Sequence, residues 1–366
     1  MVSVFFCPRV CAVLLKETNL SVILDNREKN ELMYCSNYSE GKRRNYCMNY
    51  IVFDLEWNQS PGGKKYSNSR LPFEIIEIGA VKMNEQREVV DVFQRLVKPQ
   101  VYNWIHDSIH EVIHVDYKDL ADGVPFPQAV EEFLDWCGEE RVFCTWGNQD
   151  VMELQRNMKY YGLLKKIKGP VTYYDAQKIY GICYKEDPCR RSLEYAIDKM
   201  RLPKAQEFHR ALTDAKYTGE IFKRLDMQVV LANPSIDVYQ NPKTRKEEIY
   251  LSYPNYDEYV SREFAEKEKV IKDREVASTK CPVCHLPAKR KIRWFMNNSR
   301  AYESVSFCQK HGYIKGKVRI RHTDEDAFYA IKTLKRIDEE KAEEIREKRD
   351  SLRKKRQAKR QSEKFV

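Results

Sequence analysis

The sequence predicts an α/β fold in which a mixed β-sheet is flanked by helices. Strand patterns come first, at residues 50–54, 73–83 and 89–97, and strand and helical patterns are mixed from there on. The 366 residues are 42% hydrophobic and 33% charged, which is typical of a globular protein with a sizeable core. Strands followed by mixed strands and helices favour a sheet with both parallel and antiparallel neighbours.

The later patterns complete this domain. Two more strands are predicted at residues 141–145 and 171–174. Helical patterns occupy residues 126–137, 151–161, 176–180, 192–200 and 211–225. The sequence has no internal repeat, and no apolar run approaches the length of a membrane span.

The first 47 residues differ in character from the rest. Their apolar start, "MVSVFFCPRVCAVLL", is interrupted by Pro8 and Arg9, and Met48 stands directly before the first clear strand. We therefore expect translation to begin at Met48 and residues 1–47 to be non-native or disordered; a secretory signal is the rival interpretation. The scattered cysteines favour a reducing, cytoplasmic location over a disulfide framework.

Charge is unevenly distributed along the chain. Residues 48–226 contain 25 Lys and Arg against 28 Asp and Glu, whereas residues 227–366 contain 33 against 22. The formal net charge of +10 therefore comes from the C-terminal part. A near-neutral body with a basic appendage indicates a polyanionic partner.

Two carboxylates stand together in the stretch "YIVFDLEWNQ". Asp54 and Glu56 are two residues apart, so on a strand their side chains point to the same face. Like charges this close repel each other. Either both lie in water at a strand end, or a cation lies between them.

Three further residues extend this pattern. In "VFCTWGNQD", Asp150 follows a buried strand at the start of a helix. In "FHRALTDAKYTGEIF", His209 comes from the loop that enters a long helix, and Asp214 comes from the first turns of that helix. Each alone is also explained as a helix N-terminal acid or a surface loop residue. Together they favour convergence on one site.

This order of residues resembles the DEDDh superfamily of 3′–5′ exonucleases, which is DnaQ-like or RNase T-like with an RNase H-like fold. The resemblance runs from Met48 to about Leu225 and includes "FEIIEIGAVK" and "SLEYAIDKMRL". Arg210 stands where the tyrosine subclass carries its Tyr, so the chain resembles the histidine subclass, and within it the KapD-like branch, whose relatives trim histone mRNA and small RNAs.

The resemblance implies a chemistry for these residues. Two Mg²⁺ or Mn²⁺ ions would be held by Asp54, Glu56, Asp150 and Asp214, with Asp54 bridging both. His209 would accept the proton of the attacking water, which suits an imidazole of unperturbed pKa near 6.5. For Trp57, stacking on a terminal base and packing in the core remain equally open.

A second constellation lies in the basic C-terminal part. Cys281 and Cys284 form one C-x-x-C, and Cys308 and His311 form a C-x-x-H. This spacing predicts one structural Zn²⁺ in a tetrahedral Cys₃His site, with His285 as the substitute ligand. A redox pair and unligated cysteines are the other interpretations.

Residues between the two zinc pairs and just beyond them are strongly basic. From Cys284 to His322, ten Lys and Arg face a single acidic residue, Glu303, and aromatic residues are interleaved. The aromatic residues are Trp294, Phe295, Tyr302 and Tyr313. This composition suits phosphate contacts with base stacking, or else a zinc-stapled module that docks onto protein.

The sequence thus predicts five parts. They are an extension (1–47), an exonuclease domain (48–226), a connector that ends in a charged helix (227–278), a small zinc-ribbon-like module (279–323) and a charged, basic helical tail (324–366). We expect a metal-dependent exonuclease acting on single-stranded nucleic acid, with RNA favoured, no membrane and unknown protein partners. A DNA exonuclease and a catalytically silent nucleic-acid-binding module remain the alternatives.

Overall fold

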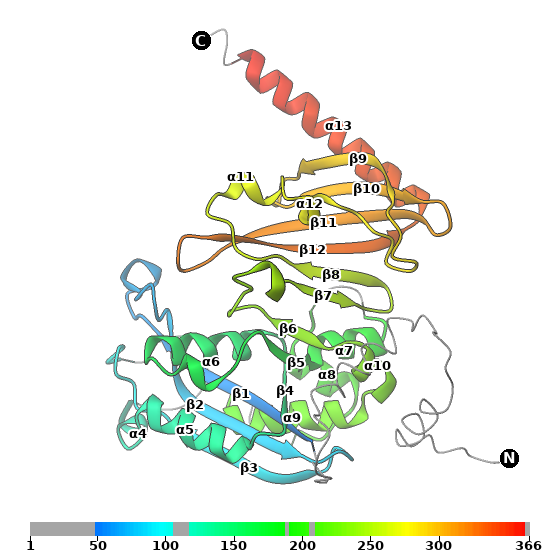
Figure 1. Ribbon diagram of the computed structural model, residues 1–366. Helices are drawn as coiled ribbons and strands as arrows, with labels where there is room; N and C mark the ends of the chain where they lie inside the picture. The colour runs from blue at the N-terminus through cyan, green and yellow to red at the C-terminus, as the bar shows by residue number, and fades with distance from the viewer. Residues whose placement is uncertain (1–47, 105–116, 187–189, 205–208, 363–366) are drawn as a thin grey trace, which may run out of the picture. The chain divides into compact units, whose positions relative to one another are not determined.

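The computed structural model describes residues 48–104, 117–186, 190–204 and 209–362 (Figure 1). The expectation for residues 1–47 lies outside this range. Within the range, no helix is both long enough and apolar enough to span a membrane.

The first sheet has six strands in the order β3-β2-β1-β4-β5-β6. They are β1 (Asn49–Gln59), β2 (Phe73–Met83), β3 (Val89–Leu96), β4 (Arg141–Thr145), β5 (Val171–Asp175) and β6 (Ser235–Asp237). The central strand β1 pairs antiparallel with β2 and parallel with β4, and β5 is parallel to β4. The predicted mixed sheet is therefore confirmed. Strand β1 continues past Asp54, where the sequence pattern ended it, to Gln59.

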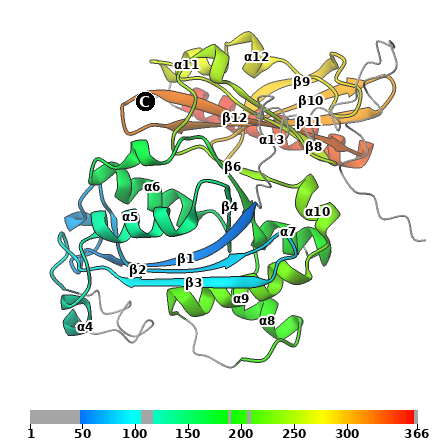
Figure 2. The same cartoon turned by 60° about the horizontal axis from the view of Figure 1, so that its bottom comes forward.

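Helices cover both faces of this sheet (Figures 1 and 2). They are α4 (Tyr117–Ala121), α5 (Phe126–Cys137), α6 (Gln149–Tyr160), α7 (Ala176–Cys183), α8 (Leu193–Lys199), α9 (Ala211–Arg224) and α10 (Met227–Ala232). Alternation along β1 builds two cores. Ile51 and Phe53 pack with α5 and α6, whereas Tyr50 and Val52 pack with α7, α8 and α9.

A second sheet has the order β7-β8-β12-β11-β10-β9 and is antiparallel throughout. Its strands are β7 (Ile249–Ser252), β8 (Tyr256–Val260), β9 (Lys289–Met296), β10 (Tyr302–Cys308), β11 (Gly312–His322) and β12 (Phe328–Ile337). The short helices α11 (Lys267–Val270) and α12 (Arg274–Ala277) pack on one face through Val270 and Val276, together with Val318 of β11.

The last helix, α13 (Glu339–Ser362), packs on the second sheet along one stripe of its surface. Ala342 and Ile345 join Ile292 of β9 and Val305 of β10 in a small core, and Leu352 is also buried. The charged C-terminal helix is confirmed, and Arg356 in its second half still donates a hydrogen bond to the backbone carbonyl of Met296 in β9.

Two sequence expectations in this region are wrong. Residues 227–278 are not an irregular connector, because they supply β6 to the first sheet and β7 and β8 to the second, and the charged helix expected at their end is two short helices, α11 and α12. Residues 328–337 are not helical. Their apolar residues also suit a strand, and pairing with β8 on one side and β11 on the other decides the conformation. The strands of the zinc module are accordingly part of a larger sheet.

Candidate active site

Strand β1 brings Asp54 and Glu56 to one end of the first sheet. Their side chains continue the face that carries Tyr50 and Val52, which is the face covered by α9. Asp54 lies opposite Gly79 of β2, and the ladder slips by one residue directly after Glu56. Such a bulge re-aims the strand where pairing is less regular.

Helix α9 brings Asp214 to the same place. A Cβ atom on Gly79 would lie 2.0 Å from the backbone N of Leu212 and 2.1 Å from the carbonyl carbon of Ala211. Only a glycine therefore lets the first turn of α9 approach β2 so closely. This contact sets the depth at which Asp214, in that first turn, meets the strand.

The result is a cluster of carboxylates. One oxygen from each of Asp54, Glu56 and Asp214 lies within 4.8 Å of the others. Asp150 is buried and accepts a hydrogen bond of 3.3 Å from the backbone N–H of Leu55, so its carboxyl group lies at the same strand segment. Among the described residues, the buried Oδ1 of Asp214 has no hydrogen-bond partner.

Burial raises the pKa of every acid in the cluster, and neighbouring carboxylates add to this effect. Burial, followed by the charges of Asp150 and Glu56, raises the pKa of Asp54 well above its usual value. Burial, followed by the charge of Asp214, raises the pKa of Glu56 to about 8. Burial likewise raises the pKa of Asp150 to about 7 and that of Asp214 to about 6. In the absence of a cation the cluster therefore favours protons, and a divalent cation would replace them.

His209 lies two residues before the start of α9 and is exposed. Its backbone is in the left-handed region, with φ of 64°, and its N–H donates a hydrogen bond of 3.2 Å to Oδ2 of Asp214. This bond ties the loop residue to the helical acid. The five-residue spacing read from the sequence is thus bridged by a turn, and both residues reach the same strand end.

Sequence reasoning missed an ion pair beside the cluster, between the buried Glu77 and the partly exposed Arg210. Glu77 of β2 lies directly opposite Glu56, and its carboxylate accepts from Arg210 Nε at 3.1 Å and from Arg210 Nη2 at 3.2 Å. Gln94 of β3 donates to it at 2.6 Å. Arg210 follows His209 directly, so the pair fastens the start of α9 to the sheet. A charged residue inside the apolar run "FEIIEIGAVK" was the available signal.

Trp57 packs against the first core and is half-buried, with its ring centroid 6.0 Å from that of Phe73. The structure therefore gives this ring a packing role, and stacking on a substrate base stays a prediction.

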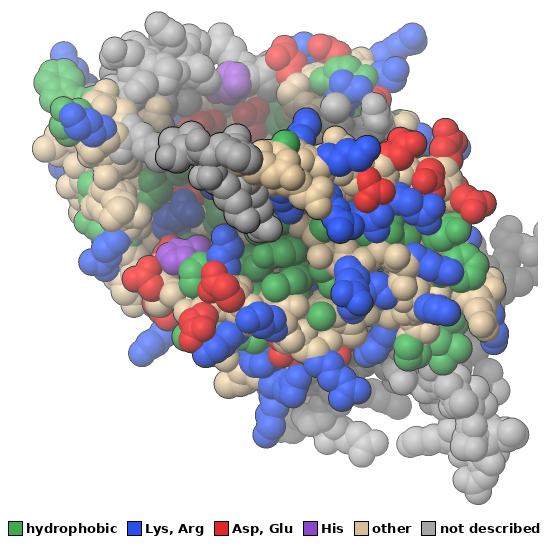
Figure 3. Space-filling view, turned by 90° about the horizontal axis from the view of Figure 1, so that it is seen from above, with side chains coloured by type: hydrophobic (Ala, Val, Ile, Leu, Met, Phe, Trp, Pro, Cys, Tyr) green, Lys and Arg blue, Asp and Glu red, His purple; other side chains and the backbone are tan. Residues whose placement is uncertain are grey.

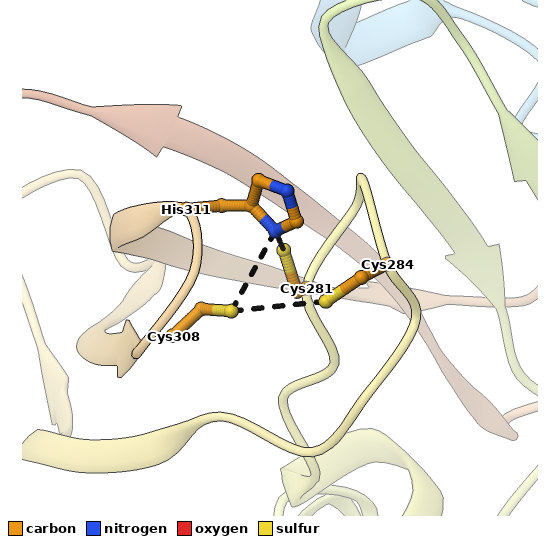
Figure 4. A group of neighbouring side chains, drawn as sticks. All are labelled: Cys281, Cys284, Cys308 and His311. Atoms are coloured by element: carbon orange, nitrogen blue, oxygen red, sulfur yellow. Dashed lines mark hydrogen bonds between the residues drawn. The ribbon is translucent and has the colours of Figure 1, made fainter.

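The four predicted zinc ligands converge from two turns (Figure 4). Cys281 and Cys284 precede β9, Cys308 ends β10, and His311 stands before β11. Sγ of Cys281 lies 3.4 Å from Nδ1 of His311, and Sγ of Cys308 lies 3.7 Å from both that nitrogen and Sγ of Cys284. Tetrahedral zinc with usual bond lengths requires S···S edges of about 3.8 Å and S···N edges of about 3.6 Å. The donor set and its spacing fit zinc.

Two details support this ligand set. Burial alone would raise the pKa of the Cys308 thiol, but hydrogen bonds from the backbone N–H groups of Lys310 and His311 and from the side chains of His311 and Cys284 together lower that pKa to about 6. A thiolate is the form that binds metal. His285, the substitute ligand, lies outside the cluster, with its Nδ1 3.7 Å from Asp257.

Comparisons with known proteins point to one family. Residues 51–222 match the RNase T family model, described as "Exonuclease". The DNA polymerase III PolC-type of Caldanaerobacter subterraneus subsp. tengcongensis is 27% identical over 176 residues, 48% of this chain and 11% of that protein. ERI1 exoribonuclease 2 of Xenopus laevis is 24% identical over 216 residues, 52% of this chain and 30% of that protein. The chain thus spans less than a third of the curated relatives that it matches.

Among solved structures, the nuclease domain of 3′hExo, "a DEDDh family member, bound to rAMP", is similar to this chain. It has 20% sequence identity and a TM-score of 0.44, and the match covers 53% of this chain and 98% of that domain. Cell-death related nuclease 4 matches with 18% identity and a TM-score of 0.41, over 53% of this chain and 71% of that chain.

Proposed function

Residues 51–222 match the RNase T exonuclease family, and on this premise we propose that the chain is a metal-dependent exonuclease of the DEDDh superfamily that removes nucleotides from the 3′ end of single-stranded nucleic acid. The observation that carries the proposal is the cluster of Asp54, Glu56 and Asp214, whose oxygens lie within 4.8 Å of one another. A fold has no stability reason to bring three acids this close. A cation gives one.

The cluster fits a hard divalent ion. Carboxylate oxygens are the ligands that Mg²⁺ and Mn²⁺ prefer, and Oδ1 of Asp214 is buried with no partner among the described residues. Asp54, Glu56 and Asp214 would hold the metal, with Asp150 beside them. One or two such ions, held by these carboxylates, would neutralise charge on the phosphodiester and make a bound water more acidic.

His209 is the group that moves the proton. It is exposed at the edge of the cluster, and its backbone is hydrogen-bonded to Asp214. The imidazole can accept a proton from the attacking water and pass it to solvent. The ion pair between Arg210 and Glu77 helps to position His209, because it holds the residue that follows His209 against the sheet.

The favoured substrate is RNA, with DNA as the second candidate. Support for RNA is the exoribonuclease name of one curated relative and the resemblance to the KapD-like branch. Support for DNA is that other curated relatives are DNA polymerases with a matching segment.

We also assign one structural Zn²⁺ to Cys281, Cys284, Cys308 and His311. A tetrahedral site with four protein ligands has no open position for substrate, so this metal would hold the β9–β10–β11 turns together rather than take part in hydrolysis.

The deciding experiment compares 5′-labelled and 3′-labelled single-stranded RNA and DNA, each with Mg²⁺ or EDTA. A 3′–5′ exonuclease releases labelled mononucleotide at once from the 3′-labelled strand and shortens the 5′-labelled strand stepwise. Asp54→Asn should abolish both in Mg²⁺. Asp122→Asn is the matched control, because Asp122 is exposed and its substitution removes the same charge outside the cluster. Mg²⁺-dependent turnover by Asp54→Asn, or release from the 5′ end first, contradicts the proposal.

A further inference from the structure

Strand β11 has two unlike faces. Ile314, Val318 and Ile320 point to the face covered by α11, α12 and the zinc turns, where they pack in two small cores. The alternate residues of the strand point to the opposite face and are all at least partly exposed. These residues are Tyr313, Lys315, Lys317, Arg319 and Arg321. Tyr313 packs beside α13, which docks at this end of the face, and the other four residues form a row of cations.

Neighbouring elements widen this row. Lys335 of β12 lies directly opposite Lys315, and Lys348 of α13 reaches over from the docked helix. Glu303 of β10 lies opposite Lys317 and is buried. Its carboxylate lies 2.9 Å from Nζ of Lys348 and 3.4 Å from Nζ of Lys315. We call Lys315, Lys317, Arg319, Arg321, Lys335 and Lys348 the basic face. Lys and Arg side chains are spread widely over this end of the protein, and acidic side chains gather in smaller groups (Figure 3).

The cations of the basic face lie close enough together to repel one another and to destabilise the fold. Lys315 and Lys335 lie directly opposite each other on paired strands, and like charges in this arrangement destabilise a sheet. Burial, and then the nearby charges of Arg319 and Lys315, lower the pKa of Lys317. Two carboxylates, Glu303 and the β8 residue Glu258, lie near this set of six cations. A polyanion would relieve the remaining repulsion.

The four aromatic residues expected to stack on bases pack inside the protein instead, contrary to the expectation from the sequence. Trp294 and Tyr302 pack in the core under α11 and α12, and Trp294 Nε1 donates to a backbone carbonyl at 2.9 Å. Phe295 and Tyr313 pack beside α13, where the hydroxyl of Tyr313 donates to Glu339 at 3.2 Å. Within the described residues, what the basic face offers is charge.

We propose that the basic face binds the sugar–phosphate backbone of a single-stranded nucleic acid, through its phosphates and without reading its bases. Alternate residues on a strand are about 6.7 Å apart, close to the spacing of successive phosphates along an extended strand. Lys and Arg therefore meet a chain of phosphates in register. The inference rests on the proposed exonuclease function for the identity of the ligand, and it assigns to β11 the grip on substrate away from the 3′ end.

The test uses the full chain carrying Asp54→Asn, so that substrate is bound but not cut. Binding of fluorescent oligouridylate of about 20 nucleotides is measured as a function of salt. Each lost phosphate contact lowers the slope of log K against log salt by about 0.7 for single strands. Lys317→Gln with Arg319→Gln should lower it by about 1.4 and weaken binding about 25-fold at about 0.1 M salt.

The matched control is Lys267→Gln with Lys272→Gln, two exposed residues in the segment that covers the other side of the sheet. It removes the same charge and should leave slope and affinity nearly unchanged. Arg321→Gln, at the exposed end of the strand, gives a second test in which folding is not disturbed and should lower the slope by about 0.7. Oligothymidylate should respond like oligouridylate, because phosphates are common to both.

The inference is overturned if the control pair loses as much affinity and salt slope as the basic-face pair, or if the slope is unchanged in both basic-face variants. It is also overturned if poly-L-glutamate of equal charge displaces the oligonucleotide as readily as unlabelled oligouridylate does, because that result would indicate an acidic polypeptide partner. Hydrolysis of thymidine 5′-(4-nitrophenyl phosphate) by chains with Asp54 intact separates the two proposals. If the parent chain fails to cleave it or any oligonucleotide, the exonuclease proposal fails. The binding assay still decides the role of the basic face.

Discussion

Replacing Gly79 by Ala tests how the active site is assembled. The added Cβ would lie 2.0 Å from the backbone N of Leu212 and 2.1 Å from the carbonyl carbon of Ala211, where ordinary contact begins at 3.4 Å. Both obstacles are backbone atoms, so no side chain can turn away. The first turn of α9 must retreat from β2 by about 1.4 Å, or the strand must move by the same amount.

This displacement sets two magnitudes. Overpacking of this kind destabilises a fold by about 1–3 kcal/mol, which lowers the melting temperature of a domain of this size by about 2–12 °C. His209 and Asp214 move with the helix. Because a misplacement of about 1 Å in a catalytic site can lower the rate about 10²-fold, activity should fall at least that far.

The assay measures the melting temperature and the Mg²⁺-dependent rate on the same preparation. Gly181→Ala is the control, since a Cβ at this position in α7 meets no atom within 4 Å. It should stabilise the protein by about 0.5–1 kcal/mol and leave the rate unchanged. If Gly79→Ala keeps both the parental melting temperature and the parental rate, the close approach of α9 to β2 does not hold the site together.

Three further predictions concern the charges and metals. The raised pKa values of Asp214 (about 6), Asp150 (about 7) and Glu56 (about 8) mean that the metal-free native state binds more protons than the unfolded state, so its free energy of unfolding should fall as the pH rises from about 4 to 8. The rise of the Asp214 pKa alone, from 3.8 to about 6, corresponds to about 3 kcal/mol of free energy of unfolding. Urea unfolding in EDTA across this pH range measures the fall in the free energy of unfolding, and Asp214→Asn should make that fall smaller. A free energy of unfolding that increases with pH contradicts the assigned pKa values. His209→Ala should lower the hydrolysis rate about 10²–10⁴-fold and gain from higher pH, and an unaltered pH–rate profile counts against a proton-accepting role. Cys281→Ser should lose one bound zinc per chain by elemental analysis, whereas Cys183→Ser should keep it; full zinc content in Cys281→Ser rejects the ligand set.

The sequence by itself determined the fold class and nominated the residues of both sites. Strand and helix periods are local properties of the chain, so the pattern placed most elements of the first sheet near their observed bounds. The spacing of Asp54 and Glu56 fixed that they share a face, and the two cysteine–histidine pairs named a complete ligand set. These features depend on neighbours a few residues apart.

The tertiary structure decided what depends on distant partners. Residues 249–260 and 328–337 became strands because each found a neighbour in the second sheet, and no local signal specifies such a partner. The pairing of Glu77 with Arg210 joins residues far apart in the sequence, as does the seat of α9 on Gly79. Register placed four of the ten basic residues between Cys284 and His322 on the basic face, whereas Arg290 of β9 donates to the carbonyl of Ala277 in α12, and Arg300 and Lys310 lie in turns. Alternation along a strand is a local property, but only the packing of other elements against each face of the sheet decides which side chains meet solvent.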